Sequence, residues 1–164
     1  APMPARTVPE PNRRLGVNDP GVSEQWALDV LGMEQLYSLL ASGRVQPRKQ
    51  ALIAVLDTGV DADHEDLAGN YQSTKKSYDT DPRGHGTHCA GIVAAVGNNN
   101  LGIAGVAYSS RIVPVRVAYG VGPYWATSDA ILADGINWAW SNGGADVLSK
   151  DRSNDYFNGA DKFF

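Results

Sequence analysis

The sequence has a single cysteine, Cys89, so no disulfide bond can form within the chain. It also lacks an apolar run of the ~18 residues that a membrane-spanning helix needs, and no signal peptide is recognisable at its start. Positive charge is not in excess, because 14 Lys and Arg stand against 18 Asp and Glu and the net charge is −4. Without a basic run or an aromatic–basic stripe, we expect neither a nucleic-acid partner nor a membrane partner.

What the sequence does contain is typical of one soluble, globular domain. Hydrophobic residues make up 43% of the chain and charged residues 20%. A chain of 164 residues is long enough to bury roughly 70% of its unfolded surface.

The two ends differ in character from the middle. Five of the nine prolines fall within residues 1–20, which predicts an extended arm over residues 1–16. The main domain is expected over residues 17–149. Residues 150–164 hold six charged residues and all three phenylalanines without periodicity. This tail is either a solvated C-terminus or a boundary at which the domain sequence has been cut or replaced.

The middle of the chain alternates between strand and helix patterns. Apolar spacing over residues 23–42 predicts a helix that Gly32 interrupts. Residues 51–56 form a continuous apolar run, typical of a strand covered on both faces of a parallel sheet. Residues 85–96 fit a helix packed closely through small residues. Residues 111–119 read as a strand, although Pro114 cannot donate to a ladder.

A further helix and strand follow. Thr127 or Ser128 could cap a helix that runs to about Trp140 and ends at Gly143-Gly144, before a short strand that begins at Asp146. The helix residues expected to face a core are Ile131, Leu132, Ile136 and Ala139. The alternation as a whole predicts an α/β fold with a parallel sheet.

Two residues in this framework carry candidate chemistry. Asp57 ends an apolar strand, where open α/β sheets place reactive groups, and an aspartate there can fix the tautomer of a histidine. His85 starts a helix between two glycines, which keeps its imidazole accessible as a general base. Taken singly, Asp57 could be a turn residue that caps Gly59. A zinc site of Asp57, His85 and His88 is a further reading, although the string is not His-Glu-x-x-His.

Taken together, the strings Ala-Val-Leu-Asp-Thr-Gly-Val-Asp and His-Gly-Thr-His-Cys-Ala-Gly resemble the subtilisin-like serine proteases, or subtilases, over about residues 17–149. The resemblance implies a three-layer fold with about four of the family's roughly seven parallel strands. It implies that Asp57 orients His85 and that His85 acts as the base for a serine. It also implies that substrate is an extended protein or peptide segment flanked by residues 117–124, and that the protein is extracellular.

The resemblance also implies a structural calcium site in the loop over residues 96–107. Calcium requires hard oxygen ligands. The implied ligands are the carboxylates of Asp19 and Asp66, the amide of Asn98 or Asn99, and the carbonyls of Val96, Leu101 and Ile103. The alternative is an Asn-rich surface turn. Cys89 matches family members with a cysteine after the histidine string, and it is either a small buried hydrophobe or a reactive thiol.

The sequence departs from the family after Ser149. Lys150-Asp151-Arg152-Ser153 stands where the family has its pocket-lining Ser-Leu-Gly or Ser-Trp-Gly, and neither a Gly-Thr-Ser nor a Gly-x-Ser-x-Gly string occurs. Ser149 and Ser153 are the serines nearest in position to a nucleophile. Whether the chain is itself an enzyme therefore stays open.

We expect an Asp–His pair that is inactive unless a second segment supplies the serine. The alternative is a non-catalytic calcium-binding or interaction module on a truncated protease scaffold. The strand at residues 146–149 would form an exposed sheet edge, which favours self-association.

Overall fold

The computed structural model of the chain describes residues 15–121 and 124–151. Most of the expected N-terminal arm, and the tail from residue 152 with Ser153 and the three phenylalanines, lie outside the described residues.

A parallel sheet forms the centre of the molecule. Its middle strand is β1 (Leu52–Asp57), which pairs in parallel with β2 (Arg111–Arg116) on one side and with β5 (Val147–Lys150) on the other. An isolated parallel bridge between Tyr71 and Ile112 extends the β2 side. The predicted α/β fold with a parallel sheet is therefore confirmed. Among the described residues this sheet has three strands and the one bridge, which is consistent with the expected incomplete sheet of about four strands.

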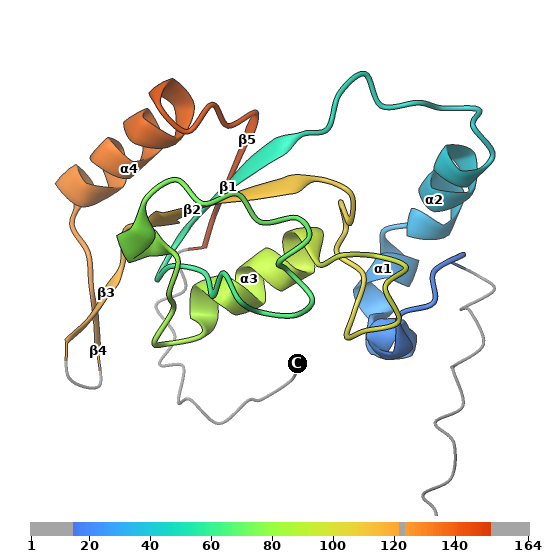
Figure 1. Ribbon diagram of the computed structural model, residues 1–164, viewed down its shortest axis with the longest axis horizontal. Coiled ribbons are helices and arrows are strands. Elements are labelled where there is room, and N and C mark those ends of the chain that lie inside the picture. The colour runs from blue at the N-terminus through green and yellow to red at the C-terminus, as the bar shows by residue number, and fades with distance from the viewer. Residues whose placement is uncertain (1–14, 122–123, 152–164) are drawn as a thin grey trace, which may run out of the picture.

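Helices cover both faces of the sheet (Figure 1). Helix α3 (His85–Ala94) lies on one face, where Val55 packs with Ala90 and Ala94. Helix α4 (Asp129–Ser141) lies on the other, where Leu56 packs with Ala139. Because successive strand residues point to opposite faces, the apolar run of β1 supplies both cores, as its uninterrupted sequence predicts.

Pro114 lies inside β2 without breaking a ladder hydrogen bond. The backbone N–H of Arg111 points toward β1 and donates to Ala51 O at 2.9 Å, whereas that of Ile112 points away and donates to Asn70 O at 2.8 Å. Alternation along the strand turns the nitrogen of Pro114 away from β1 as well, so its missing N–H costs no bond to that strand.

Helix α4 begins where the sequence predicted, and two of the four residues predicted to face a core, Ala139 and Leu132, do pack against one. Ser128 Oγ accepts a hydrogen bond from the Ile131 backbone N–H at 3.2 Å, which confirms the predicted cap. Ile131 and Ile136 are exposed, so the prediction that they face a core is wrong. Gly135 is buried instead, and a Cβ added there would lie 2.4 Å from Val117 Cγ1. The helix approaches the sheet closely because a residue without a side chain faces it.

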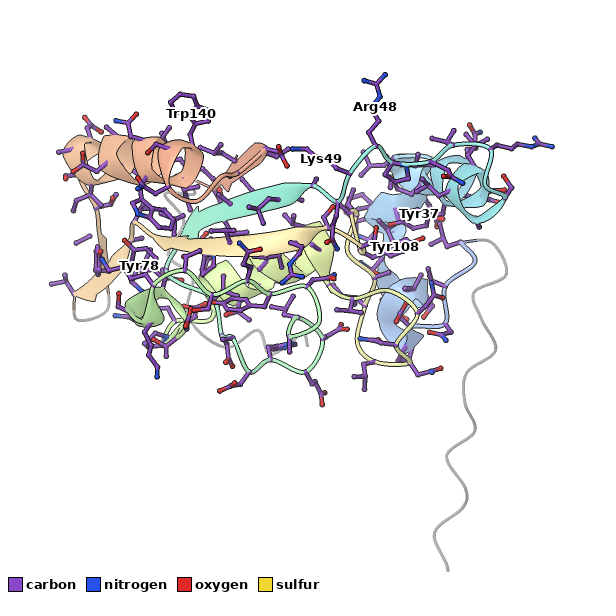
Figure 2. The ribbon with its side chains drawn as sticks, turned by 45° about the horizontal axis from the view of Figure 1, so that its top comes forward. Tyr37, Arg48, Lys49, Tyr78, Tyr108 and Trp140 are labelled. Atoms are coloured by element: carbon purple, nitrogen blue, oxygen red, sulfur yellow. The ribbon has the colours of Figure 1, made fainter. Side chains whose placement is uncertain are left out.

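The N-terminal helices form a separate core at one end of the sheet. They are the 3₁₀ helix η1 (Pro20–Glu24), α1 (Trp26–Val30) and α2 (Met33–Ala41), and Gly32 with a φ of +69° makes the predicted interruption. Tyr37 OH donates to Gly105 O at 3.0 Å, and its ring meets Tyr108 edge to face (Figure 2). Leu15, the first described residue, is buried in this core.

The remaining elements surround the carboxyl ends of the strands. They are the 3₁₀ helix η2 (Lys76–Tyr78) and a hairpin of β3 (Tyr119–Val121) and β4 (Tyr124–Ala126). Within the described ranges, no helix combines the length and the apolar character needed to cross a membrane.

Candidate active site

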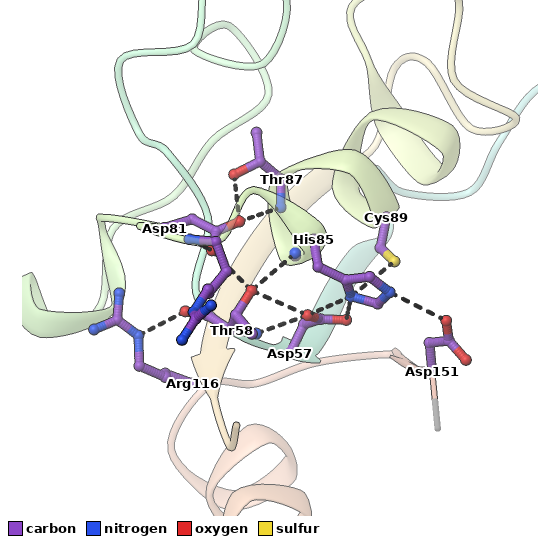
Figure 3. Close-up of polar contacts among 10 residues, drawn as sticks. Asp57, Thr58, Asp81, His85, Thr87, Cys89, Arg116 and Asp151 are labelled. Atoms are coloured by element: carbon purple, nitrogen blue, oxygen red, sulfur yellow. Dashed lines mark hydrogen bonds and ion pairs between the residues drawn. The ribbon is translucent and has the colours of Figure 1, made fainter. Parts of the chain in front are cut away.

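Asp57 and His85 meet at the end of the sheet (Figure 3). Asp57 is the last residue of β1 and His85 is the first residue of α3. His85 Nδ1 lies 2.8 Å from Oδ1 and 2.9 Å from Oδ2 of Asp57. A carboxylate only accepts, so Nδ1 carries the proton and donates it. Asp57 is 5% exposed and the His85 side chain 12% exposed, so solvent screens the pair little.

The close approach of β1 and α3 requires glycine at two positions. A Cβ on Gly86 would lie 2.0 Å from the carbonyl oxygen of Gly59 and 3.0 Å from Asp57 Cβ. Gly59 has a φ of +110°, a region that side chains other than glycine rarely adopt. These glycines let the helix start lie directly against the end of the strand, which brings the imidazole within reach of the carboxylate.

The first turn of α3 is capped by side chains from outside the helix. Thr58 Oγ1 accepts from the Gly86 backbone N–H at 3.0 Å, and the same hydroxyl donates to Asp81 Oδ1 at 2.7 Å. Asp81 Oδ2 accepts from both the backbone N–H and the hydroxyl of Thr87, each at 2.8 Å. These contacts satisfy N–H groups that have no partner within the helix, and they fix the turn that carries His85.

Sequence reasoning did not identify Thr58, Asp81 or Arg116 as part of this site. Arg116 ends β2, and its Nε donates to Thr58 O at 2.8 Å while Nη2 donates to the carbonyl of Thr80 and, at 3.0 Å, to its hydroxyl. The guanidinium thereby ties the loop after Asp57 to the loop before His85. Asp81 lies three residues before Gly84, the N-cap of α3, so the usual N-cap pattern did not indicate it.

The environment of His85 favours its charged form. Hydrogen bonding to Asp57, followed by that to Cys89, raises the pKa of His85 to about 10, against a smaller opposing effect of burial. Asp151, which follows β5, adds a carboxylate oxygen 3.5 Å from Nε2 (Figure 3). The contacts of both ring nitrogens with carboxylates therefore favour the protonated imidazole.

A third side chain, that of Cys89, lies beside the Asp57–His85 pair. Its Sγ lies 3.8 Å from His85 Nδ1, one helical turn further along α3. The carboxylate, imidazole and thiol have ligand atoms that all lie within 4.8 Å of one another. The thiol takes the place that the zinc reading of the sequence gave to His88.

Asp19 and Asp66, two of the predicted calcium ligands, both contact the loop over residues 96–107, away from the Asp57–His85 pair. Asp19 accepts from the backbone N–H groups of Asn98 at 2.8 Å and Asn99 at 3.1 Å. Asp66 accepts from the Asn99 side-chain amide at 2.7 Å and from the Ile103 N–H at 2.9 Å. The backbone N–H of Val96 donates to the Asp66 carbonyl at 2.8 Å. The loop therefore folds around two carboxylates, which are 4% and 2% exposed.

Burial, followed by the nearby charge of Asp19, raises the pKa of Asp66. Carboxylate, amide and carbonyl oxygens are the ligands that calcium takes, and a divalent cation beside these two carboxylates would offset their repulsion.

Other predicted site residues lie elsewhere. Ser149 is in β5, opposite Val55 of β1. Residues 119–121 of the segment expected to flank substrate form β3, and its pairing with β4 occupies one of its edges.

Comparison with known proteins supports the sequence resemblance. The sequence profile of the subtilase family matches residues 48–150. Thermitase from Thermoactinomyces vulgaris is 45% identical over 104 residues, which are 60% of this chain and 36% of thermitase. Human furin is 36% identical over 115 residues, 62% of this chain and 14% of furin. A solved protease structure from Pseudoalteromonas arctica superposes with a TM-score of 0.56 and 34% identity, over 75% of this chain and 44% of that one. The chain thus spans about a third or less of these curated relatives.

Proposed function

Because the chain belongs to the subtilase family, we propose that it supplies the aspartate and histidine of a serine endopeptidase, with the nucleophile coming from outside these 164 residues. The observation that carries this proposal is the two-oxygen contact between Asp57 and His85 Nδ1. That contact holds the proton on Nδ1 and turns Nε2 toward whatever group completes the site. It is the arrangement that a Ser-His-Asp mechanism needs.

In that mechanism each residue has a defined task. His85 Nε2 takes the proton of the serine hydroxyl as the oxygen attacks the peptide carbonyl, and it later gives this proton to the departing amine. Asp57 keeps the ring oriented and stabilises the imidazolium that forms. The substrate is a protein or peptide, and the site of action is extracellular.

The chain alone is proposed to be inactive because it lacks the nucleophile. Without the serine, no acyl-enzyme forms, and an absent oxyanion donor costs a further 10²–10³ in rate, to order of magnitude.

A chimaera tests this proposal. Residues 15–149 are joined to the part of thermitase that follows its aligned segment, and hydrolysis of a fluorogenic peptide is measured beside the 164-residue chain. The chimaera should turn over substrate, and the chain alone should not. His85→Ala should lower the rate of the chimaera by roughly 10⁴-fold or more, whereas His88→Gln should change it little. Activity that survives His85→Ala would refute the assigned role.

A second candidate function rests on Asp19 and Asp66. Two buried carboxylates from separate segments, both hydrogen-bonded to one loop, favour a non-catalytic, calcium-binding module, whose cation would tie the N-terminal segment to residues 96–103. Calcium at a hundredfold excess over its dissociation constant should stabilise the chain by about 2.7 kcal/mol. Thermal unfolding in calcium and in chelator measures this difference, which Asp66→Asn should remove. Equal unfolding of the parent chain in both conditions would exclude the module.

The outer edge of β5 suggests self-association. Val147 and Leu148 are exposed on this short strand, whose outer edge pairs with no strand of the described residues, and such an edge is a template for another strand. Trp140 projects outward from the neighbouring α4 (Figure 2) and adds apolar surface. Analytical ultracentrifugation should show dimers or larger species that Leu148→Lys reduces; a monomer at high concentration would contradict this.

A further inference from the structure

The cluster of Asp57, His85 and Cys89 has the composition of a metal site. Within the described ranges, 15–121 and 124–151, these three side chains form a cluster whose ligand atoms all lie within 4.8 Å of one another. Each member offers one atom of a different kind: a carboxylate oxygen, an imidazole nitrogen and a sulfur. That mixture suits a borderline-soft divalent ion such as Zn²⁺ and not Ca²⁺, which takes oxygen alone.

The geometry is close to what such an ion requires. Zinc bonds of 2.0–2.3 Å at tetrahedral angles place ligand atoms about 3.3–3.8 Å apart. The 3.8 Å between Cys89 Sγ and His85 Nδ1 already meets this spacing. The 2.8 Å between Nδ1 and Asp57 Oδ1 must widen by about 0.5 Å, which a small rotation of the carboxylate provides.

The fold holds these ligands on rigid elements. His85 and Cys89 stand four residues apart on α3, the spacing that puts two ligands on one helical face, and Asp57 comes from the end of β1. The other nitrogen of His85 faces Asp151 at 3.5 Å. A carboxylate in that position is the usual outer partner of a metal-bound histidine, because it accepts the remaining ring N–H.

We propose that Asp57, His85 and Cys89 bind one Zn²⁺ ion, with water in a fourth position. Binding releases the Nδ1 proton and the thiol proton to solvent, so the two negative ligands balance the charge of the ion. The same event removes the Nδ1–H that joins His85 to Asp57. The ion and the catalytic pairing therefore exclude each other, and zinc would inhibit any enzyme that uses this pair.

Cadmium and zinc titrations of the 164-residue chain test the proposal, in excess calcium so that the loop of Asp19 and Asp66 does not take the added metal. Cadmium should produce the ultraviolet absorption of a thiolate–cadmium bond at one ion per chain. Calorimetry with zinc should give the same stoichiometry. Cys89→Ser should abolish the absorption and weaken zinc at least tenfold, about 1.4 kcal/mol. His88→Gln is the matched control and should leave both unchanged.

Several results would overturn the site. The first is a parent chain that gives no thiolate–cadmium absorption, which decides the question without any variant. Zinc binding that Cys89→Ser leaves intact, or that His88→Gln weakens equally, would do the same. Circular dichroism verifies that Cys89→Ser keeps the fold. The readout is binding and not peptide hydrolysis, so its failure would leave the proposed endopeptidase role untouched.

Discussion

Replacing Asp57 by Asn should lower both the pKa of His85 and the stability of the chain. Asn keeps the shape of the side chain but removes the charge that faces Nδ1 at 2.8 and 2.9 Å. The pKa of His85 stands at about 10, against 6.5 for an unperturbed histidine. At ~1.4 kcal/mol per pKa unit, this preference for the protonated ring contributes at most about 5 kcal/mol to folding.

The pH dependence follows from the direction of this change. A pKa that is raised in the folded chain gives a contribution that is fully present below pH 6.5 and fades as the pH rises through about 10. Asp57→Asn should therefore cost about 2–5 kcal/mol at pH 6 and progressively less toward pH 10. Urea denaturation at the two pH values measures the difference, and NMR titration of the His85 ring measures the pKa.

Asp151→Asn provides the matched control. It removes the carboxylate that faces the other ring nitrogen, but this side chain is 47% exposed and its oxygen lies 3.5 Å away. We expect an effect within about 0.5 kcal/mol. The reasoning would be refuted if the pKa of His85 in Asp57→Asn stayed near that of the parent, or if the stability gap were as large at pH 10 as at pH 6.

Substitutions at three further positions, two of them with a matched control, test the supports of the site and of α4. Asp81→Ala should lower the free energy of unfolding in urea by about 2–4 kcal/mol, because it removes both bonds from Thr87, one of which caps α3. It should also shift the NMR signals of the His85 ring. The control Asp79→Ala removes bonds outside α3 and should leave those signals in place. Gly86→Ala should cost at least about 2 kcal/mol, since its Cβ would meet a carbonyl at 2.0 Å, and near-parent stability would contradict the described approach. Ser128→Ala should cost about 1 kcal/mol, and Ser128→Gly only a few tenths.

Features that depend on neighbouring residues in the chain were predictable from the sequence. Gly32 interrupts the N-terminal helix, and Ser128 caps α4, because each acts within a few positions of its own. The apolar run of β1 showed by itself that both faces of the strand are covered. Asp57 and His85 were found through two strings that together are specific.

Features that depend on tertiary approach were not predictable. Ala139 faces the core as its spacing suggested, but Ile131 and Ile136 do not, because the sheet lies against Gly135, which sequence spacing did not single out. The cap of α3 comes partly from Thr58, 28 residues before Gly86, and no local pattern announces a contact of that range. Cys89, and not His88, completes the three-ligand cluster with Asp57 and His85. Helical spacing alone did not decide between these two residues.

The borrowed cap of α3 bears on the order in which the molecule assembles. Ten residues are too few for a stable isolated helix, and the acceptors for its leading amides arrive only when β1 and the loop through Asp81 are in position. The imidazole thus acquires its orientation as a late step of folding and not as a property of a preformed segment. Hydrogen exchange at Gly86 and Thr87 should accordingly proceed through opening of the whole domain, which makes these two amides reporters of its global unfolding.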